Sequence, residues 1–333
     1  MAVPAPTPRE DIYRAYWAFA SERQHIFESR LDRQPPPWTN DPILAEYRFC
    51  NTFRAADRVS QHLIQHAAYG DPTADIDDLF LRIVLHRLFC RPATWELLET
   101  ELGPIDARSF APDAYDAVLE TALRNGQRLY TGAFILCANR AYGFERKHRN
   151  HLALLAAMLA DGVPQRIADA GSLEAVYREL HKWPLIGPFM AYQLAIDLNY
   201  SSIVEFSEND FVVPGPGADR GLAKVFASLN RMTPSEAIQW LVEQQDSVAG
   251  TLGITPPTLF GRSLHAIDCQ NLLCEVDKYC RAAFPALASN RSRIKQRHTP
   301  NPTSYQLFFP PSWEINETIP DAWRHHVSDP AYL

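Results

Sequence analysis

The sequence predicts an all-α protein, and three observations support this prediction. Glycine is scarce, with 14 Gly among 333 residues against 26 Pro. Tight β-hairpins depend on glycine, so this composition disfavours turn-dense β folds. Apolar residues recur at i, i+3, i+4 and i+7 along most of the chain, without sustained strand alternation. A hydrophobic content of 46% with 11% aromatics is enough to form a sizeable core.

Helical periodicity defines the elements of the first half of the chain in order. The predicted helices have apolar residues at three- and four-residue intervals, and they cover residues 11–30, 42–66, 76–89, 115–123 and 147–160. The last of these contains the longest apolar run, 152–160, which is far shorter than the roughly 20 residues needed to cross a bilayer. We therefore expect no membrane partner.

The second half continues the same pattern. Its predicted helices cover residues 173–183, 188–199, 218–229, 235–247 and 262–281. In the last one, Cys269, Leu273, Val276 and Cys280 repeat at helical spacing and predict one packed face. The six cysteines contain no CxxC pair, so we expect reduced thiols, no metal and no cofactor. The expected fold is a helical array.

Proline and charge suggest how the chain is organised. Prolines concentrate at both ends, which predicts a Pro-rich N-terminal segment with one helix (1–40), a helical domain (41–285) and a basic, then Pro-rich tail (286–333). The net charge of −7 argues against a protein that coats nucleic acid by bulk charge. No secretory signal is recognisable, so we expect an intracellular protein, nuclear if eukaryotic and otherwise cytoplasmic.

A helix-hairpin-helix outline occupies residues 173–199. The helix ending at Trp183 is followed by Pro184–Gly187 and by a second helix with Pro188 at its first position. The backbone N–H groups at Gly187 and Phe189 could bind a DNA phosphate at this helix N-terminus. A Pro–Gly turn between two core helices is the alternative.

A possible catalytic carboxylate and an anion site follow the hairpin. Asp210 lies about twenty residues after the hairpin. This spacing resembles that of many helix-hairpin-helix DNA glycosylases, in which an essential Asp follows the hairpin at the same distance. Phe189 stands where lyase-type members carry an amine, so a Schiff-base mechanism is not expected. The turn after Asp210 brings together four residues that could hold a phosphate or pyrophosphate: Gly215, Gly217, Arg220 and Lys224. The alternative is a loop that only redirects the chain.

Two polar stripes and one basic cluster complete the candidates. Asn51, Arg54 and Arg58 would share a helix face, and a late helix carries Asp268, Asn271, Glu275 and Lys278; either stripe could be solvated surface. The basic cluster has no acidic residue and predicts contact with a DNA backbone, or else a solvated connector or nuclear targeting segment. Its members are Lys278, Arg281, Arg291, Arg293, Lys295 and Arg297.

Five segments, taken as an ordered set, resemble the α-glutamyl/putrescinyl thymine pyrophosphorylase family, also described as amino acid:DNA transferases. The same helical module occurs in 5-hydroxymethyl-deoxyuridine DNA kinases. The segments are FCNTFRAADR (49–58), YTGAFILCAN (130–139), WPLIGPFMAYQLAIDLNY (183–200), ENDFVVPGPGADRG (208–221) and IDCQNLLCEVDKYCR (267–281).

The resemblance implies a helix-hairpin-helix DNA glycosylase-like fold and action on a 5-substituted uracil in double-stranded DNA, flipped from the stack. It further implies displacement of pyrophosphate by an amine or amino-acid co-substrate, with Asp210 as general base and Arg220 and Lys224 at the leaving group. Asn51, Arg54, Asn139 and Glu275 are second-tier candidates for binding the base or the amine.

Two alternatives remain open. One is a DNA glycosylase for a modified pyrimidine such as 5-hydroxymethyluracil. The other is a non-catalytic DNA-binding module that accompanies a DNA kinase. The sequence contains no GxxxxGK[ST] loop, which excludes a P-loop kinase activity of this chain alone, so a separate kinase could be a partner.

Overall fold

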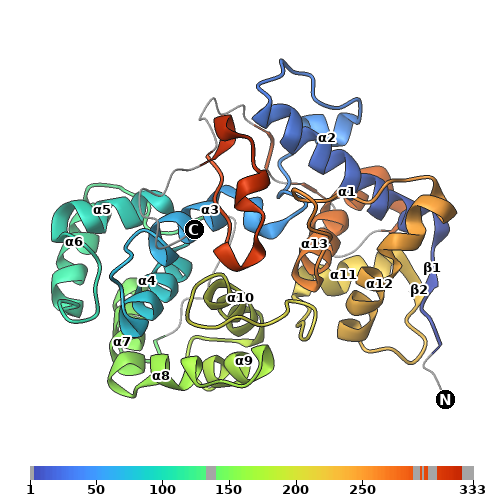
Figure 1. Ribbon diagram of the computed structural model, residues 1–333. Coiled ribbons are helices and arrows are strands. Elements are labelled where there is room, and N and C mark those ends of the chain that lie inside the picture. Colours follow the sequence, from blue (N-terminus) through green and yellow to red (C-terminus); the bar gives the residue numbers. More distant parts are fainter. Residues whose placement is uncertain (1–3, 133–139, 288–292, 295, 299–305, 325–333) are drawn as a thin grey trace. The chain divides into compact units, whose positions relative to one another are not determined.

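The computed structural model describes residues 4–132, 140–287, 293–294, 296–298 and 306–324. These residues are predominantly helical, which confirms the all-α prediction. The chain forms two compact units (Figure 1). The first combines residues from 1–57, 208–307 and 315–325, and the second combines residues from 58–207, 308–314 and 326–333.

The first unit is built around a buried C-terminal helix. Its main helices are α1 (Glu10–Leu31), α2 (Pro42–Glu46), α11 (Pro216–Val225), α12 (Pro234–Leu252) and α13 (Ala266–Ala283). Short 3-10 turns complete it: η1 (Arg54–Ala56), η3 (Pro285–Leu287), η5 (Asn316–Thr318) and η6 (Asp321–Trp323). Helix α13 packs against α1, α11 and α12 (Figure 1). Strands β1 (Thr7–Pro8) and β2 (Phe226–Ser228) pair antiparallel at the edge.

Close packing of α11 on α13 depends on two glycines. A Cβ atom at Gly221 would lie 2.1 Å from the backbone oxygen of Leu273, and one at Gly217 would lie 2.2 Å from Cys274 Sγ. Both distances are far below van der Waals contact, so only glycine allows the two helix backbones to approach this closely. The structure thus gives Gly217 a packing role, whereas the sequence suggested a ligand-binding one.

The second unit surrounds helix α4. It contains α3 (Arg58–His62), a π-helix (Leu63–Ala68), α4 (Ile76–Phe89), α5 (Pro92–Leu102), α6 (Pro112–Arg124), α7 (Lys147–Ala160), α8 (Val163–Ala168), α9 (Leu173–His181), α10 (Pro188–Asn199) and η4 (Pro311–Trp313). Helix α4 contacts the π-helix, α5, α7, α8 and α10. Arg87 Nη2 of α4 donates to Asp197 Oδ1 of α10 over 2.7 Å, so a buried ion pair joins two core helices.

The predicted continuous helix over 42–66 was wrong. Residues 47–53 are not helical, and the chain instead forms α2, η1, α3 and the π-helix in succession. The N–H groups of Cys50 and Asn51 in this segment donate to side-chain carboxylates and not to carbonyls one turn away. Asn51, Arg54 and Arg58 consequently do not share a helix face. The sequence analysis also missed α5 and α8, and it extended α11 over the residues of β2.

No helix in the described part of the chain is long and apolar enough to cross a membrane.

Candidate functional site

The hairpin of the second unit presents an open helix N-terminus. Helices α9 and α10 pack side by side, and the turn between them places Leu185 at a φ of 69°. This left-handed conformation is one that glycine adopts most easily. Gly187 and Pro188 are exposed, and no side chain caps α10. Phe189 is half-buried. The backbone N–H groups of the first turn and the helix dipole make this end suitable for an anion.

Asp210 lies in the first unit on a firmly anchored loop. On one side of it, Glu208 is buried and forms an ion pair with Arg262, and Asn209 Oδ1 accepts from the backbone N–H of Ala266 over 2.9 Å. On the other side, Val212 accepts a hydrogen bond from a side-chain hydroxyl of α12. The Asp210 side chain itself is exposed and makes no hydrogen bond or ion pair with any described residue. A fixed backbone therefore holds a carboxylate that is free to meet a ligand.

Arg220 and Lys224 point to an internal partner. Arg220 Nε lies 3.1 Å from Asp277 Oδ2 and Lys224 Nζ lies 2.9 Å from Asp277 Oδ1, while Arg281 Nη2 lies 2.6 Å from Oδ2. The Asp277 side chain is fully buried. Burial alone raises the pKa of this carboxyl, but the hydrogen bonds from Arg281 and Lys224 outweigh it and hold the pKa below its usual value.

This ion cluster leaves little charge for an external anion. Lys224 is 5% exposed, and Arg220 is the more accessible of the two, with 26% of its side chain exposed. Gly215 is buried and forms the N-cap of α11 without a side-chain cap. Of the four residues expected to hold pyrophosphate, the structure therefore leaves Arg220 as the one with a reachable cationic side chain.

The segment 49–57 is held by three carboxylates, of which Glu275 and Asp268 are buried and Asp57 is half-buried. Glu275 Oε2 accepts from Cys50 N over 3.1 Å, Asp57 Oδ1 from Asn51 N over 2.8 Å, and Asp268 Oδ1 from Arg54 N over 2.8 Å. Burial raises the pKa of Asp57 to about 6, and burial followed by repulsion from Glu208 raises that of Asp268 to about 6. The polar stripe of α13 is thus an internal scaffold and not a solvated surface.

Asn51, Arg54 and Glu275 belong to this scaffold. They are 5%, 5% and 3% exposed, respectively. Asn51 Nδ2 donates to the Ala56 carbonyl over 2.7 Å, and Asn51 Oδ1 accepts from Arg23 Nη2 over 2.6 Å. The structure therefore brings these three candidates together, but it places them behind the surface.

The basic cluster is divided between internal ion pairs and solvent. Lys278 Nζ lies 2.5 Å from Glu275 Oε2, and Arg281 binds Asp277 as described above. The Arg293 carbonyl accepts from Arg281 Nη1 over 3.2 Å. The side chain of Arg297 is 78% exposed and lies 3.2 Å from a carboxylate oxygen of Glu46. Arg291, Lys295 and Asn139 lie outside the described residues.

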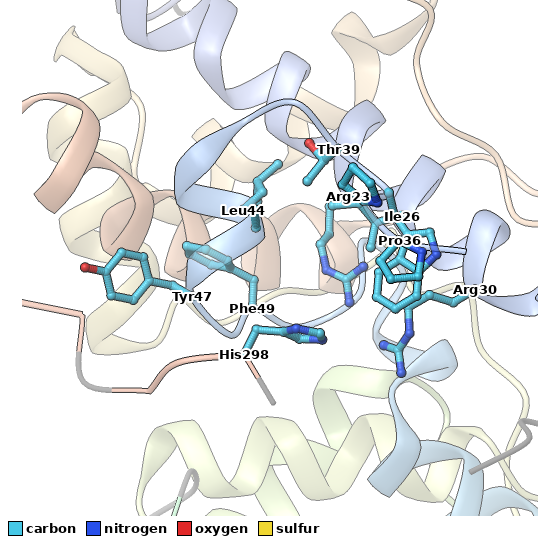
Figure 2. A pocket seen from close by; sticks show the side chains of 12 residues that line it. Arg23, Ile26, Arg30, Pro36, Thr39, Leu44, Tyr47, Phe49 and His298 are labelled. Atoms are coloured by element: carbon cyan, nitrogen blue, oxygen red, sulfur yellow. The ribbon is translucent and has the colours of Figure 1, made fainter. Parts of the chain in front are cut away.

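An aromatic cavity in the first unit was missed by the sequence analysis. It has a volume of about 190 Å³, and its wall combines α1, the loop that follows α1, and a strand-like stretch near residue 298 (Figure 2). The polar and aromatic residues that line it are Arg23, Arg30, Trp38, Tyr47, Phe49 and His298. Arg23 and Arg30 are seven residues apart, which places them on one face of α1, and this was the only signal available in the sequence.

Several contacts fix the geometry of this cavity. The Trp38 indole N–H donates to the Gln34 carbonyl over 2.7 Å, and the Arg30 guanidinium lies 5.5 Å from the centre of the same ring. The ring of His298 stands edge-on to Trp38, with the ring centres 6.1 Å apart. Burial and then the charges of Arg30 and Arg23 lower the pKa of His298. His298 is therefore neutral at pH 7 and can donate or accept a hydrogen bond.

Comparison with known proteins identifies the helical array. Residues 10–289 match the family model of the helical domain of 5-hmdU DNA kinase. A 5-hmdU DNA kinase of Bacillus phage SP10 is 24% identical over 294 residues, which are 82% of this chain and 46% of the kinase. The chain thus spans about half the length of this relative, and no solved structure matches it. Because the matched region covers most of the chain and includes α1, the chain belongs to the family of 5-hmdU DNA kinase helical domains.

Proposed function

We propose that this chain acts on DNA that contains a 5-hydroxymethyluracil-derived base, and that it replaces a pyrophosphate on the 5-methylene group with an amine or amino acid. The family relationship supports the choice of base, since the relative is named for 5-hmdU in DNA. The exposed, firmly anchored carboxylate of Asp210 carries the proposal of catalysis. A group held in this way reaches a substrate without first losing a partner inside the protein.

Asp210 would act as the general base in this reaction. It takes a proton from the incoming ammonium group, and the freed nitrogen lone pair forms a bond to the 5-methylene carbon. The carbon–oxygen bond to pyrophosphate breaks at the same centre, and the pyrophosphate leaves with the bonding electron pair. Arg220, the reachable cation at the α11 turn, would stabilise the negative charge of this leaving group.

The α10 N-terminus would position the DNA backbone. Its start is exposed at Gly187 and Pro188 and has no side-chain cap, and α10 is 12 residues long, so the backbone donors and the helix dipole both favour a phosphate. Phosphate contacts of this kind orient a duplex without reading its sequence. The phosphorylated substrate would come from a kinase activity outside these 333 residues, which contain no GxxxxGK[ST] loop.

Mass spectrometry of nucleosides tests this function. A duplex carrying pyrophosphorylated 5-hydroxymethyluracil is incubated with the protein and a mixture of amino acids and polyamines. We expect a mass gain at the base and release of pyrophosphate, and we expect Asp210→Asn to abolish both while leaving DNA affinity unchanged. Free base with abasic sites would instead indicate a glycosylase. Bound but unchanged DNA would indicate a binding module, and normal turnover by Asp210→Asn would refute the proposed base.

A further inference from the structure

The cavity of the first unit contains a buried cation with spare hydrogen-bonding capacity. Arg23 is 8% exposed, and its Nη2 atom donates to Asn51. Its Nη1 atom is buried and has no hydrogen-bond partner among the described residues. A buried guanidinium nitrogen that lacks a partner is costly, so a ligand that accepts a hydrogen bond there would be favoured. Figure 2 shows the side chains of Arg23 and His298 pointing toward each other across this cavity.

The charge of the wall selects the sign of the ligand. Arg23 and Arg30 both line the cavity, and no Asp or Glu is among the described residues of its wall. An amine would be repelled there, whereas a phosphoryl group would gain charge-assisted hydrogen bonds from two guanidinium groups. The phosphoryl group therefore occupies this part of the cavity, and it neutralises the charge of the wall before an amine approaches the 5-methylene carbon.

The shape of the cavity selects a single flat ring. Ligand pockets usually measure about 300–1,000 Å³, whereas this cavity measures about 190 Å³, which suits one nucleobase with a small substituent. Trp38, Tyr47, Phe49 and His298 supply aromatic surface on several sides. Stacking on aromatic side chains is the usual way in which proteins hold an unstacked base, and neutral His298 can bond its polar edge.

We propose that this cavity binds the pyrimidine ring of the modified nucleotide, extruded from the duplex, together with the phosphorylated 5-methylene group. The ring would lie against Trp38, and the phosphoryl oxygens of the bound substrate would face Arg23 Nη1 and Arg30, whereas Arg220 would act on the pyrophosphate only as it leaves. This inference rests on the proposed function, and it adds a base-binding site that neither Asp210 nor the hairpin provides. Asn51 acts as a positioning residue, because its side chain holds the Arg23 guanidinium in place.

Calorimetric titration with short oligonucleotides tests the site independently of turnover. The probe is a single-stranded trinucleotide whose central base is 5-(phosphomethyl)uracil, and the same trinucleotide with central thymine is the comparison. We expect the phosphorylated probe to bind about tenfold tighter, as appropriate for charge-assisted hydrogen bonds. Trp38→Ala should weaken both probes, and Arg30→Gln should remove most of the preference for the phosphorylated one.

A matched variant and a competitor control for folding and for bulk charge. Arg231→Gln removes the same charge at an exposed position outside the cavity, and it should bind both probes as the unmodified protein does. Arg23→Lys keeps a cation in the wall but loses the second guanidinium nitrogen, so it should also reduce the preference. Thermal unfolding of each variant shows whether the fold is retained.

The outcomes separate this inference from the proposed function. Trp38-dependent binding of the phosphorylated probe, without any turnover by mass spectrometry, would support the cavity and refute the transferase. Normal turnover by the unmodified protein, together with unchanged probe binding by Trp38→Ala and by Arg30→Gln, would support the transferase and refute the cavity. Inorganic pyrophosphate could also displace the probe at a concentration equal to that of the probe, and to the same extent from the unmodified protein and from Trp38→Ala. This result would refute a base-binding site as well.

Discussion

The stability of the first unit depends on the buried carboxylate of Asp277. Its fully buried side chain is the shared partner of three cations that approach within 3.1 Å, namely Arg220, Lys224 and Arg281. Asp277→Asn keeps the volume and removes the charge. Lys224, which is 5% exposed, would then remain buried without a counter-ion. Removing one partner of a buried pair costs about 3–5 kcal/mol, because the other charge stays desolvated.

Denaturant and thermal unfolding measure this cost. A loss of about 3–5 kcal/mol should lower the melting temperature of the first unit by roughly 6–20 °C, at about 2–4 °C per kcal/mol for domains of this size. The control is Asp321→Asn, whose side chain is 88% exposed and lies 3.6 Å from Arg324, so it should cost less than about 0.5 kcal/mol. Adding Lys224→Met to Asp277→Asn should restore part of the loss. A loss below about 1 kcal/mol in the single variant would refute the reasoning.

Three further outcomes follow from particular contacts. Gly221→Ala should destabilise the first unit by about 1–3 kcal/mol in urea unfolding, since its Cβ would meet α13 at 2.1 Å, whereas Gly250→Ala, with open space around it, should stabilise slightly. Burial raises the pKa of Asp57 to about 6, above its unfolded value of about 3.9. Between these two pKa values the folded state binds more protons than the unfolded state, so the free energy of unfolding falls as the pH rises from about 4 to about 6. Asp57→Asn should flatten this fall, by on the order of 2 kcal/mol, when unfolding is followed from pH 4 to 7; an unchanged slope would contradict the burial argument. Gly187→Asp should raise helix stability as an N-cap but weaken DNA binding about tenfold in an anisotropy titration, while Gly171→Asp, also exposed, should leave DNA binding intact.

Local periodicity predicted the helices whose hydrogen bonds close within the helix. The residues of α4, α7 and α10 carry apolar side chains at helical spacing, and their predicted bounds match those of the structure. The family resemblance, which rests on segments 49–58, 130–139, 183–200, 208–221 and 267–281, was likewise confirmed for the helical domain of 5-hmdU DNA kinase. The site assignments stay predictions, because nothing in the fold tests which residues touch a substrate.

Prediction failed where distant side chains replace local backbone bonds. Residues 47–53 have helical spacing, but the carboxylates of Glu275 and Asp268 accept the N–H groups of Cys50 and Arg54. These partners are more than two hundred residues away in the sequence, so no local pattern could indicate them. The cavity escaped notice for the same reason, since His298 reaches it through backbone hydrogen bonds that join 296–298 to 46–48.

Helix α13 shows why the reactive surface lies elsewhere. Several of its sides are internal: Cys269 and Cys280 are buried on one, Asp268 and Glu275 are at most 4% exposed on another, and the fully buried Asp277 faces α11. Each of these carboxylates already has a backbone or cationic partner, so recruiting it for catalysis would cost the stability of the unit. Among the described residues, the free carboxylate of Asp210 and the unpartnered nitrogen of Arg23 stay open to a ligand. A charged group that no internal partner satisfies is a candidate for contact with a ligand.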